Sequence, residues 1–170
     1  MTLFEFAVRH LRPLARIPGL AQLFDSGLLA WTSLFDRPRL AAMEAFEAAA
    51  LALPGVKPRV HRLGGLGFAA RGCEFAHLHG NGLLDVRVGR EGARELIARG
   101  GAEPHHVFGP SAWISLWICS ASDLPRASLV LQTAHAGLVT ASEASEANVT
   151  TRIGTPNVAF AGFVRPADGA

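Results

Sequence analysis

Two short extended runs around a glycine-rich turn constrain the fold of this chain more than any other feature. Residues 73–79 and 83–88 both have the composition of strands, and Gly80-Asn81-Gly82 stands between them. Glycine and asparagine tolerate the left-handed backbone conformations that tight hairpin turns require. The sequence therefore predicts a β-hairpin near the middle of the chain.

The turn length decides which side chains of this hairpin share a face, because side chains along a strand alternate between the two faces of a sheet. A three-residue turn sets His77 opposite Asp85, whereas a two-residue Asn-Gly turn sets the histidines against Leu84 and Val86. Only the three-residue turn gathers the polar side chains of both strands. We therefore expect His77 and Asp85 to be cross-strand neighbours on one face, here called the polar face, with these members: Phe75, His77, His79, Leu83, Asp85 and Arg87.

The segments around the hairpin predict an α+β fold, with a single antiparallel sheet, helices packed on one face and the His- and Trp-lined polar face opposite. A strand over 112–119 adds Trp113, Ser115 and Trp117 to the polar face. Asp36 and Pro38 are typical of a helix start. The remaining elements are expected as helices at 36–53, 90–99 and from Ser122, and as strands at 56–63 and 66–70.

The length of 170 residues and the 49% hydrophobic content are typical of one domain with a full core. We place a helical arm at residues 1–35 and the α+β domain at 36–139. Residues 140–170 are expected to be a linker, over 141–152, and a tail with an edge strand at 157–164.

Composition narrows the functional classes. The net charge of +2, from 16 basic and 14 acidic residues, does not favour binding to nucleic acid. Cys73 and Cys119 form no metal or disulfide pattern, and we expect both to be buried as small hydrophobic residues in a cytoplasmic protein. Residues 1–20 are amphipathic, which makes peripheral contact with a membrane an alternative to packing on the domain.

The polar face is the candidate site, and it is expected to bind a flat polar organic molecule. His77, His79 and His105 are the candidate acid–base residues. Metal binding is an open alternative because His-x-His on a strand directs both rings the same way, and His105 or His106 could supply a third ligand. A clear third and fourth ligand is nevertheless missing. We therefore expect no metal and no cofactor. Of the remaining histidines, His61 is expected on a strand surface and His135 in the core or on a helix surface. The candidate substrate-binding residues are Asp85, Arg87, His106, Trp113, Ser115 and Trp117.

Several runs over residues 36–139 resemble the luciferase-domain family, which includes the fungal luciferases. The resemblance lies in Glu74 to Val88, Ala93 to Leu96, Glu103 to His106 and Trp113 to Leu116. It implies a pocket formed by His77, His79, His105 and Trp113, and oxidation of a hydroxylated pyrone by molecular oxygen without metal or flavin. This chain departs from the fungal pattern in a shorter loop after the histidine pair, in Asp85 at a histidine position, and in having an amphipathic stretch where the fungal proteins carry a membrane segment.

Three hypotheses follow. The first is a cofactor-independent oxygenase acting on a hydroxylated aromatic or pyrone-like substrate with O₂, in which a histidine removes a proton. The second is a non-catalytic small-molecule binding module that uses the same pocket. The third is a DNA- or partner-binding domain, suggested by the helix–strand–helix order of residues 90–139, and the balanced charge disfavours its DNA-binding form.

Overall fold

The fold rests on one six-stranded antiparallel sheet. The structure is a computed structural model that describes residues 19–105 and 110–153. The strands lie in the order β1-β2-β3-β4-β6-β5, and each pair of neighbours is antiparallel. This confirms the predicted α+β class with a single sheet. The strands are β1 (Lys57–Val60), β2 (Leu66–Ala70), β3 (Cys73–Leu78), β4 (Leu83–Arg87), β5 (Glu103–Pro104) and β6 (Trp113–Trp117).

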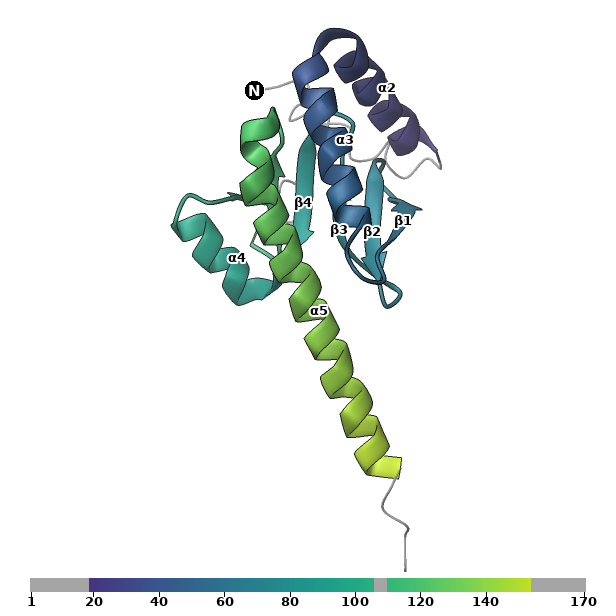
Figure 1. The fold of residues 1–170 in the computed structure, drawn as a ribbon, viewed down its shortest axis with the longest axis vertical. Helices are drawn as coiled ribbons and strands as arrows, with labels where there is room; N and C mark the ends of the chain where they lie inside the picture. Colours follow the sequence, from purple (N-terminus) through teal and green to yellow (C-terminus); the bar gives the residue numbers. More distant parts are fainter. Residues whose placement is uncertain (1–18, 106–109, 154–170) are drawn as a thin grey trace, which may run out of the picture.

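Two helices, α3 (Arg37–Leu51) and α5 (Leu124–Ile153), lie side by side across one face of this sheet (Figure 1). Asp36 caps α3 by accepting a hydrogen bond from the backbone N–H of Arg39, and Pro38 stands in the first turn, as predicted. The core lies between these helices and the sheet. Its fully buried members include Phe46, Phe68, Leu84, Val86, Ile114 and Leu131.

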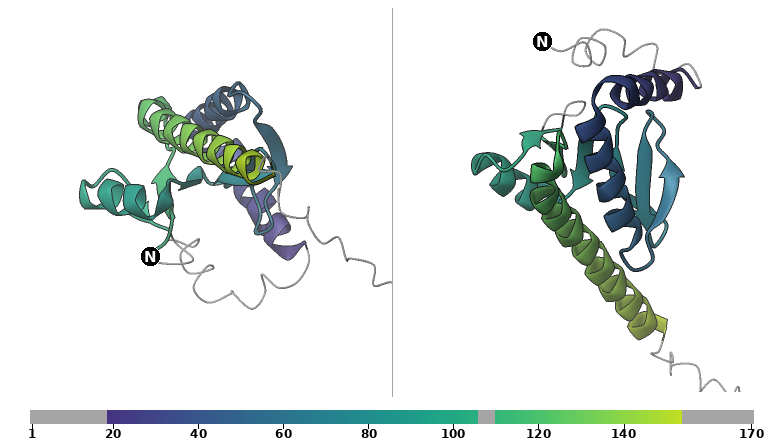
Figure 2. Two further views of the ribbon diagram at one scale, coloured as in Figure 1. Left: turned by 90° about the horizontal axis from the view of Figure 1, so that it is seen from below. Right: turned by 45° about the horizontal axis from the view of Figure 1, so that its top comes forward.

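Helix α2 (Leu20–Phe35) lies on the opposite side of the sheet from α3 and α5 (Figure 2, left). It packs where the hairpin turns. The hydroxyl of Thr32 donates to the carbonyl of Gly80 over 2.8 Å, and the Asp25 carboxylate accepts from the backbone N–H of Gly80 over 3.1 Å. A Cβ on Gly80 would come within 2.5 Å of backbone atoms of Asp25 and Leu29, so only glycine permits this approach. Helix α2 thereby covers one end of the polar face.

The hairpin has the predicted register. His77 pairs with Asp85, and the backbone N–H of His79 donates to the carbonyl of Leu83 over 2.8 Å, so Gly80-Asn81-Gly82 is a three-residue turn. Asn81 stabilises it by accepting from the Leu83 N–H. The prediction that His77 and Asp85 are cross-strand neighbours is confirmed.

Phe75 was predicted on the polar face, and a β-bulge places it on the opposite face instead. Phe68 pairs with Ala76 but Ala69 pairs with Glu74, so the register shifts by one residue and Phe75 has no partner on β2. Phe75 is 1% exposed, belongs to the core and contacts the ring of His135 on α5. Phe75 therefore faces the helices, and Glu74 joins the histidines on the polar face.

Other differences concern the ends of the chain and the cysteines. Helix α4 (Gly89–Ala98) lies close to its predicted place, and the 3₁₀ turn Ala121–Asp123 starts earlier than the predicted cap at Ser122. Helix α5 continues to Ile153, so residues 141–152 are helical where we predicted a linker. The predicted strand at 157–164 and the amphipathic residues 1–18 lie outside the described residues.

Cys73 and Cys119 are both exposed, so the prediction that they are buried is wrong. Both stand near strand ends, where few neighbours cover them. Of the two places predicted for His135, core or helix surface, the structure shows the buried one, and its Nε2 lies 2.9 Å from the Pro54 carbonyl. Within the described part of the chain, no helix has the length and apolar character needed to cross a membrane.

Candidate functional site: a histidine cluster around a buried carboxylate

The centre of the site is the carboxylate of Asp85, which is 0% exposed. The Nε2 atoms of three histidines face its Oδ2 oxygen, at 3.0 Å for His77, 3.4 Å for His79 and 3.7 Å for His105. The hydroxyl of Ser115 donates to the other oxygen, Oδ1, over 2.5 Å. Three separate segments thus converge on one carboxyl group.

The register of the central strands positions this cluster. His77 pairs with Asp85, and Asp85 pairs with Ser115, so the three side chains form a row across β3, β4 and β6. His79 stands at the hairpin end, and His105 follows directly on β5. Because the residues of such a row share one face, the hairpin and β6 place His77, Asp85 and Ser115 together without help from the helices.

Two further carboxylates contact the histidines at Nδ1, the ring nitrogen that does not face Asp85. Glu74 Oε1 lies 3.2 Å from Nδ1 of His77 and 2.5 Å from Nδ1 of His61. Asp25 Oδ1 lies 3.0 Å from Nδ1 of His79. His77 and His79 are therefore each fixed between two carboxylates, one at each ring nitrogen.

Aromatic rings enclose the cluster. The ring of His61 stacks on His77 with a centroid distance of 3.7 Å and an interplanar angle of 11°. The indole of Trp113 lies 5.3 Å from the ring of His77 and 6.2 Å from that of His105. His77, His79 and His105 are each 5% exposed, so these rings leave little of the cluster open to solvent.

The charges in the cluster depend on one another. Partial burial works to raise the pKa of Glu74, but hydrogen bonds to His61 and His77 outweigh it and lower that pKa to about 2. Burial works to lower the pKa of His77, yet hydrogen bonds to Asp85 and Glu74 raise it above its usual value. In the same way, Asp25 and Asp85 overcome burial and raise the pKa of His79 to about 9. Without another cation, the cluster therefore favours ion pairs between imidazolium and carboxylate.

The predicted site residues fall into three groups. The structure brings together His77, His79, His105, Asp85, Trp113 and Ser115. Arg87 pairs with Trp113 and is exposed at the edge of the site, and Trp117 pairs with Leu83 two positions further along β6. His106 lies outside the described residues.

The sequence interpretation missed Asp25, His61 and Glu74. Asp25 was part of the predicted arm, and nothing local in the sequence shows where α2 docks. His61, read as strand surface, instead stacks on His77 and contacts Glu74. For Glu74 one signal existed, because a phenylalanine among histidines on a polar face is out of pattern and a bulge resolves it.

Two groups of side chains have donor atoms close enough to hold a metal ion. The first consists of His61, Glu74 and His77, and the second of His77, Asp85 and His105; within each, the donor atoms lie within 4.8 Å of one another. The expectation of a metal-free site rests on the lack of a clear third and fourth ligand in the sequence. The tertiary structure brings a third candidate donor into each group, so the absence of a local third ligand no longer argues against a metal.

Comparisons with known proteins agree with the motifs in the sequence. No curated protein and no solved structure gave a significant match to the chain. A family model did match, over the hairpin, α4, β6 and the first part of α5. That segment contains Glu74, His77, His79, Asp85, His105, Trp113 and Ser115, whereas Asp25 and His61 lie before it. The matching model is described as the Luciferase domain and covers residues 72–134, which agrees with the resemblance seen in the sequence.

Proposed function

We propose that this domain binds a small, flat, weakly acidic organic molecule, such as a hydroxylated aromatic or a pyrone-like compound, in its deprotonated form. The observation that carries the proposal is the cross-strand pair of Arg87 and Trp113, which stands beside His77. A guanidinium, an indole face and an imidazole gathered at one end of the central strands β4 and β6 are suited to an aromatic oxyanion.

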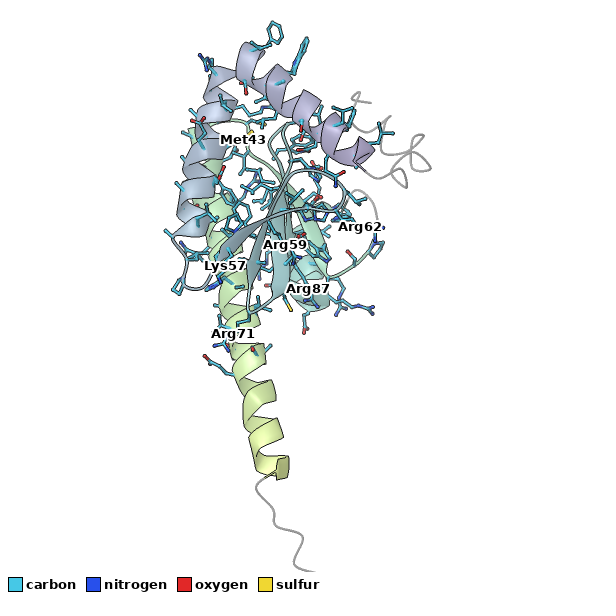
Figure 3. The ribbon with its side chains drawn as sticks, turned by 90° about the vertical axis from the view of Figure 1, so that its right-hand side faces the viewer. Met43, Lys57, Arg59, Arg62, Arg71 and Arg87 are labelled. Carbon is cyan, nitrogen blue, oxygen red and sulfur yellow. The ribbon has the colours of Figure 1, made fainter. Side chains whose placement is uncertain are left out.

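The expected contacts follow from the chemistry of these groups. The ring of the ligand stacks on Trp113, and its oxyanion accepts hydrogen bonds from the Arg87 guanidinium. Arg62 and Arg87 both lie on the side of the sheet away from α3, and they add positive charge there (Figure 3). Because the histidines behind Trp113 are 5% exposed, the organic ligand lies at the outer edge of the cluster rather than beside Asp85.

Reaction of this bound anion with molecular oxygen is the activity that the family resemblance adds. A phenolate or enolate is electron-rich, and a site that stabilises the anion raises the fraction of ligand able to react. The competing hypothesis is a binding module that stops at the complex. Oxygen consumption separates these two hypotheses, because only the first requires it.

The proposal is tested by calorimetric titration with a hydroxylated pyrone and with its O-methyl ether, which cannot ionise. We expect the hydroxylated compound to bind more tightly, and Arg87→Gln to weaken its binding about 10-fold, the loss of one charge-assisted contact. The matched control is Arg94→Gln, an exposed arginine of α4, which should bind as the wild type does. Equal binding of the ether, or an equal effect of both substitutions, would refute the proposal. An oxygen electrode run with the same compounds then decides between turnover and binding alone.

A further inference from the structure

The donor atoms of the cluster are arranged as the ligands of one metal ion. Nε2 of His77, His79 and His105 face Oδ2 of Asp85 at 3.0, 3.4 and 3.7 Å. A divalent transition metal binds nitrogen and oxygen at about 2.0–2.2 Å, so adjacent ligands stand about 3.0 Å apart at octahedral angles and about 3.4 Å apart at tetrahedral angles. The separations of 3.0 and 3.4 Å match these two values, and that of 3.7 Å is slightly longer. The donor atoms of His77, Asp85 and His105 all lie within 4.8 Å of one another, so small side-chain adjustments would bring them around one ion, with His79 beside them.

Hydrogen bonding explains the His77–Asp85 contact well and the longer contacts of His79 and His105 with Asp85 less well. An N–H···O hydrogen bond spans about 2.7–3.2 Å, and only the His77 distance of 3.0 Å falls within that range. The distances from Asp85 to His79 and His105 are longer, although both rings present Nε2 to the same oxygen. Rings that converge on one point at ligand-to-ligand spacing are typical of a metal centre.

The hydrogen bonds that these side chains make to neighbouring residues also support a metal centre. A histidine bound to a metal through Nε2 usually donates its Nδ1–H to a carboxylate or a carbonyl, which fixes the ring and its tautomer. Glu74 accepts this bond from His77, and Asp25 accepts it from His79. The second oxygen of Asp85 is held in turn by Ser115.

Burial distinguishes this group from the second candidate set. The side chains of His77, His79 and His105 are 6, 6 and 4% exposed, and that of Asp85 is 0% exposed. The set with His61 and Glu74 is more open, with 16 and 18% exposure, and the hydrogen bonds of Glu74 already account for it. The near-complete burial of these four side chains favours a single ion over an organic molecule as their occupant.

We propose that His77, His79, His105 and Asp85 bind one divalent first-row transition metal ion. Imidazole with a single carboxylate suits zinc, iron(II) or manganese(II), whereas calcium and magnesium prefer all-oxygen sites. Glu74, Asp25 and Ser115 act as positioning residues that hold the ligands. This proposal is independent of the organic ligand proposed above, and it replaces the expectation of a metal-free site.

The test uses the full chain, purified without a histidine tag or added metal, stripped with a chelator and titrated with Zn²⁺ alone. We expect one ion per chain and a higher unfolding temperature, because an ion bound by the folded state stabilises it. Titration with Co²⁺ should give the visible absorption of cobalt with nitrogen ligands. A folded wild type that binds no Zn²⁺, or Co²⁺ with the absorption of the hydrated ion, overturns the proposal.

Three substitutions locate the ion. His105→Gln removes a ligand that lies in a loop, so the sheet should survive, and affinity should fall about 100-fold or more, beyond the roughly 10–100-fold loss typical of an outer partner. His135→Gln is the matched control, since this buried histidine lies behind the core, bonded to Pro54, and should leave affinity unchanged. His61→Gln separates the two candidate sets. If His61→Gln abolishes binding while His105→Gln does not, the ion belongs to the other set and the proposal is wrong.

If His105→Gln fails to fold, the absorption spectrum of the wild type with Co²⁺ still shows whether the ion has nitrogen ligands. All of these measurements are made without any organic compound. A failure of the metal proposal and a failure of the proposed function are therefore distinguishable.

Discussion

The two faces of the central sheet are built from the same strands but held by different forces. The face toward α3 and α5 carries Phe68, Ala76, Val86 and Ile114, all 0% exposed, and its stability comes from buried apolar area. On the polar face, four histidines, the carboxylates of Glu74 and Asp85 and that of Asp25 from α2 are joined by directed contacts. The first face is expected to tolerate repacking, whereas the second depends on the position of each atom. This difference leads us to assign stability to the first face and function to the second.

The largest expected effect on stability comes from the apolar face. Phe46 is 0% exposed, and its ring packs edge-to-face with Phe68 at a centroid distance of 6.0 Å. We expect Phe46→Ala to lower the free energy of unfolding by about 3–5 kcal/mol, since it leaves a cavity between α3 and the sheet. Urea unfolding measures this loss. On the polar face, Ser115→Ala should cost less, about 1–3 kcal/mol for one buried hydrogen bond. A larger loss for Ser115→Ala would reverse the assignment of the two faces.

A substitution at Gly80 tests how the polar face is closed. The added Cβ of Gly80→Ala would meet backbone atoms of α2 at 2.5 Å, so the helix must shift and the contact of Asp25 with His79 must weaken. We expect a loss of about 1–3 kcal/mol and faster hydrogen exchange in α2. The matched control is Gly27→Ala, a glycine of α2 itself, because a Cβ added there meets nothing within 4 Å. It should be neutral or stabilising by up to about 1 kcal/mol. Unchanged exchange in Gly80→Ala would show that α2 docks differently.

The pH dependence of stability should differ between the faces in chelator-treated protein. The pKa of Glu74 is lowered from 4.5 to about 2, so its contribution is present above pH 4.5 and is lost as the pH falls toward 2. The pKa of His79 is raised from 6.5 to about 9, so its contribution is present below pH 6.5 and is lost as the pH rises through 9. These two groups therefore stabilise the fold together between about pH 4.5 and 6.5.

Urea unfolding across this range measures the dependence. In His79→Gln the loss of stability between pH 6.5 and 9 should become smaller, whereas Phe46→Ala should lower stability by a similar amount at every pH. An unchanged alkaline profile in His79→Gln would contradict the role given to its ion pairs with Asp25 and Asp85.

The smallest effect is expected from truncation after residue 140. The buried side chains of α5 that belong to the core are Ala127, Val130, Leu131 and Ala134, all before this point. Beyond it, Arg71 and Glu143 form an exposed pair at 3.4 Å, which is worth little. We expect the shortened chain to remain folded and to unfold within about 1 kcal/mol of the full chain. Insoluble protein would show that the rest of α5 belongs to the domain.

The sequence by itself determined the hairpin and its register. The Gly80-Asn81-Gly82 turn and the two-residue alternation of the strands were enough to pair His77 with Asp85, and the same alternation placed Ser115 and Trp113 beside them. These features are local, because turn geometry and strand pleat depend on a few neighbouring residues.

Tertiary structure alone decided which groups complete the site. The bulge between β2 and β3 moved Glu74 to the polar face and Phe75 into the core, where the burial of its ring outweighs strict alternation. The docking of α2 brought Asp25 to His79 across 54 positions of sequence. Contacts of this kind depend on how separate elements pack, and the pattern of a few neighbouring residues in the sequence does not predict them. The ligands and their supports therefore became visible only when the strands and α2 were placed in space.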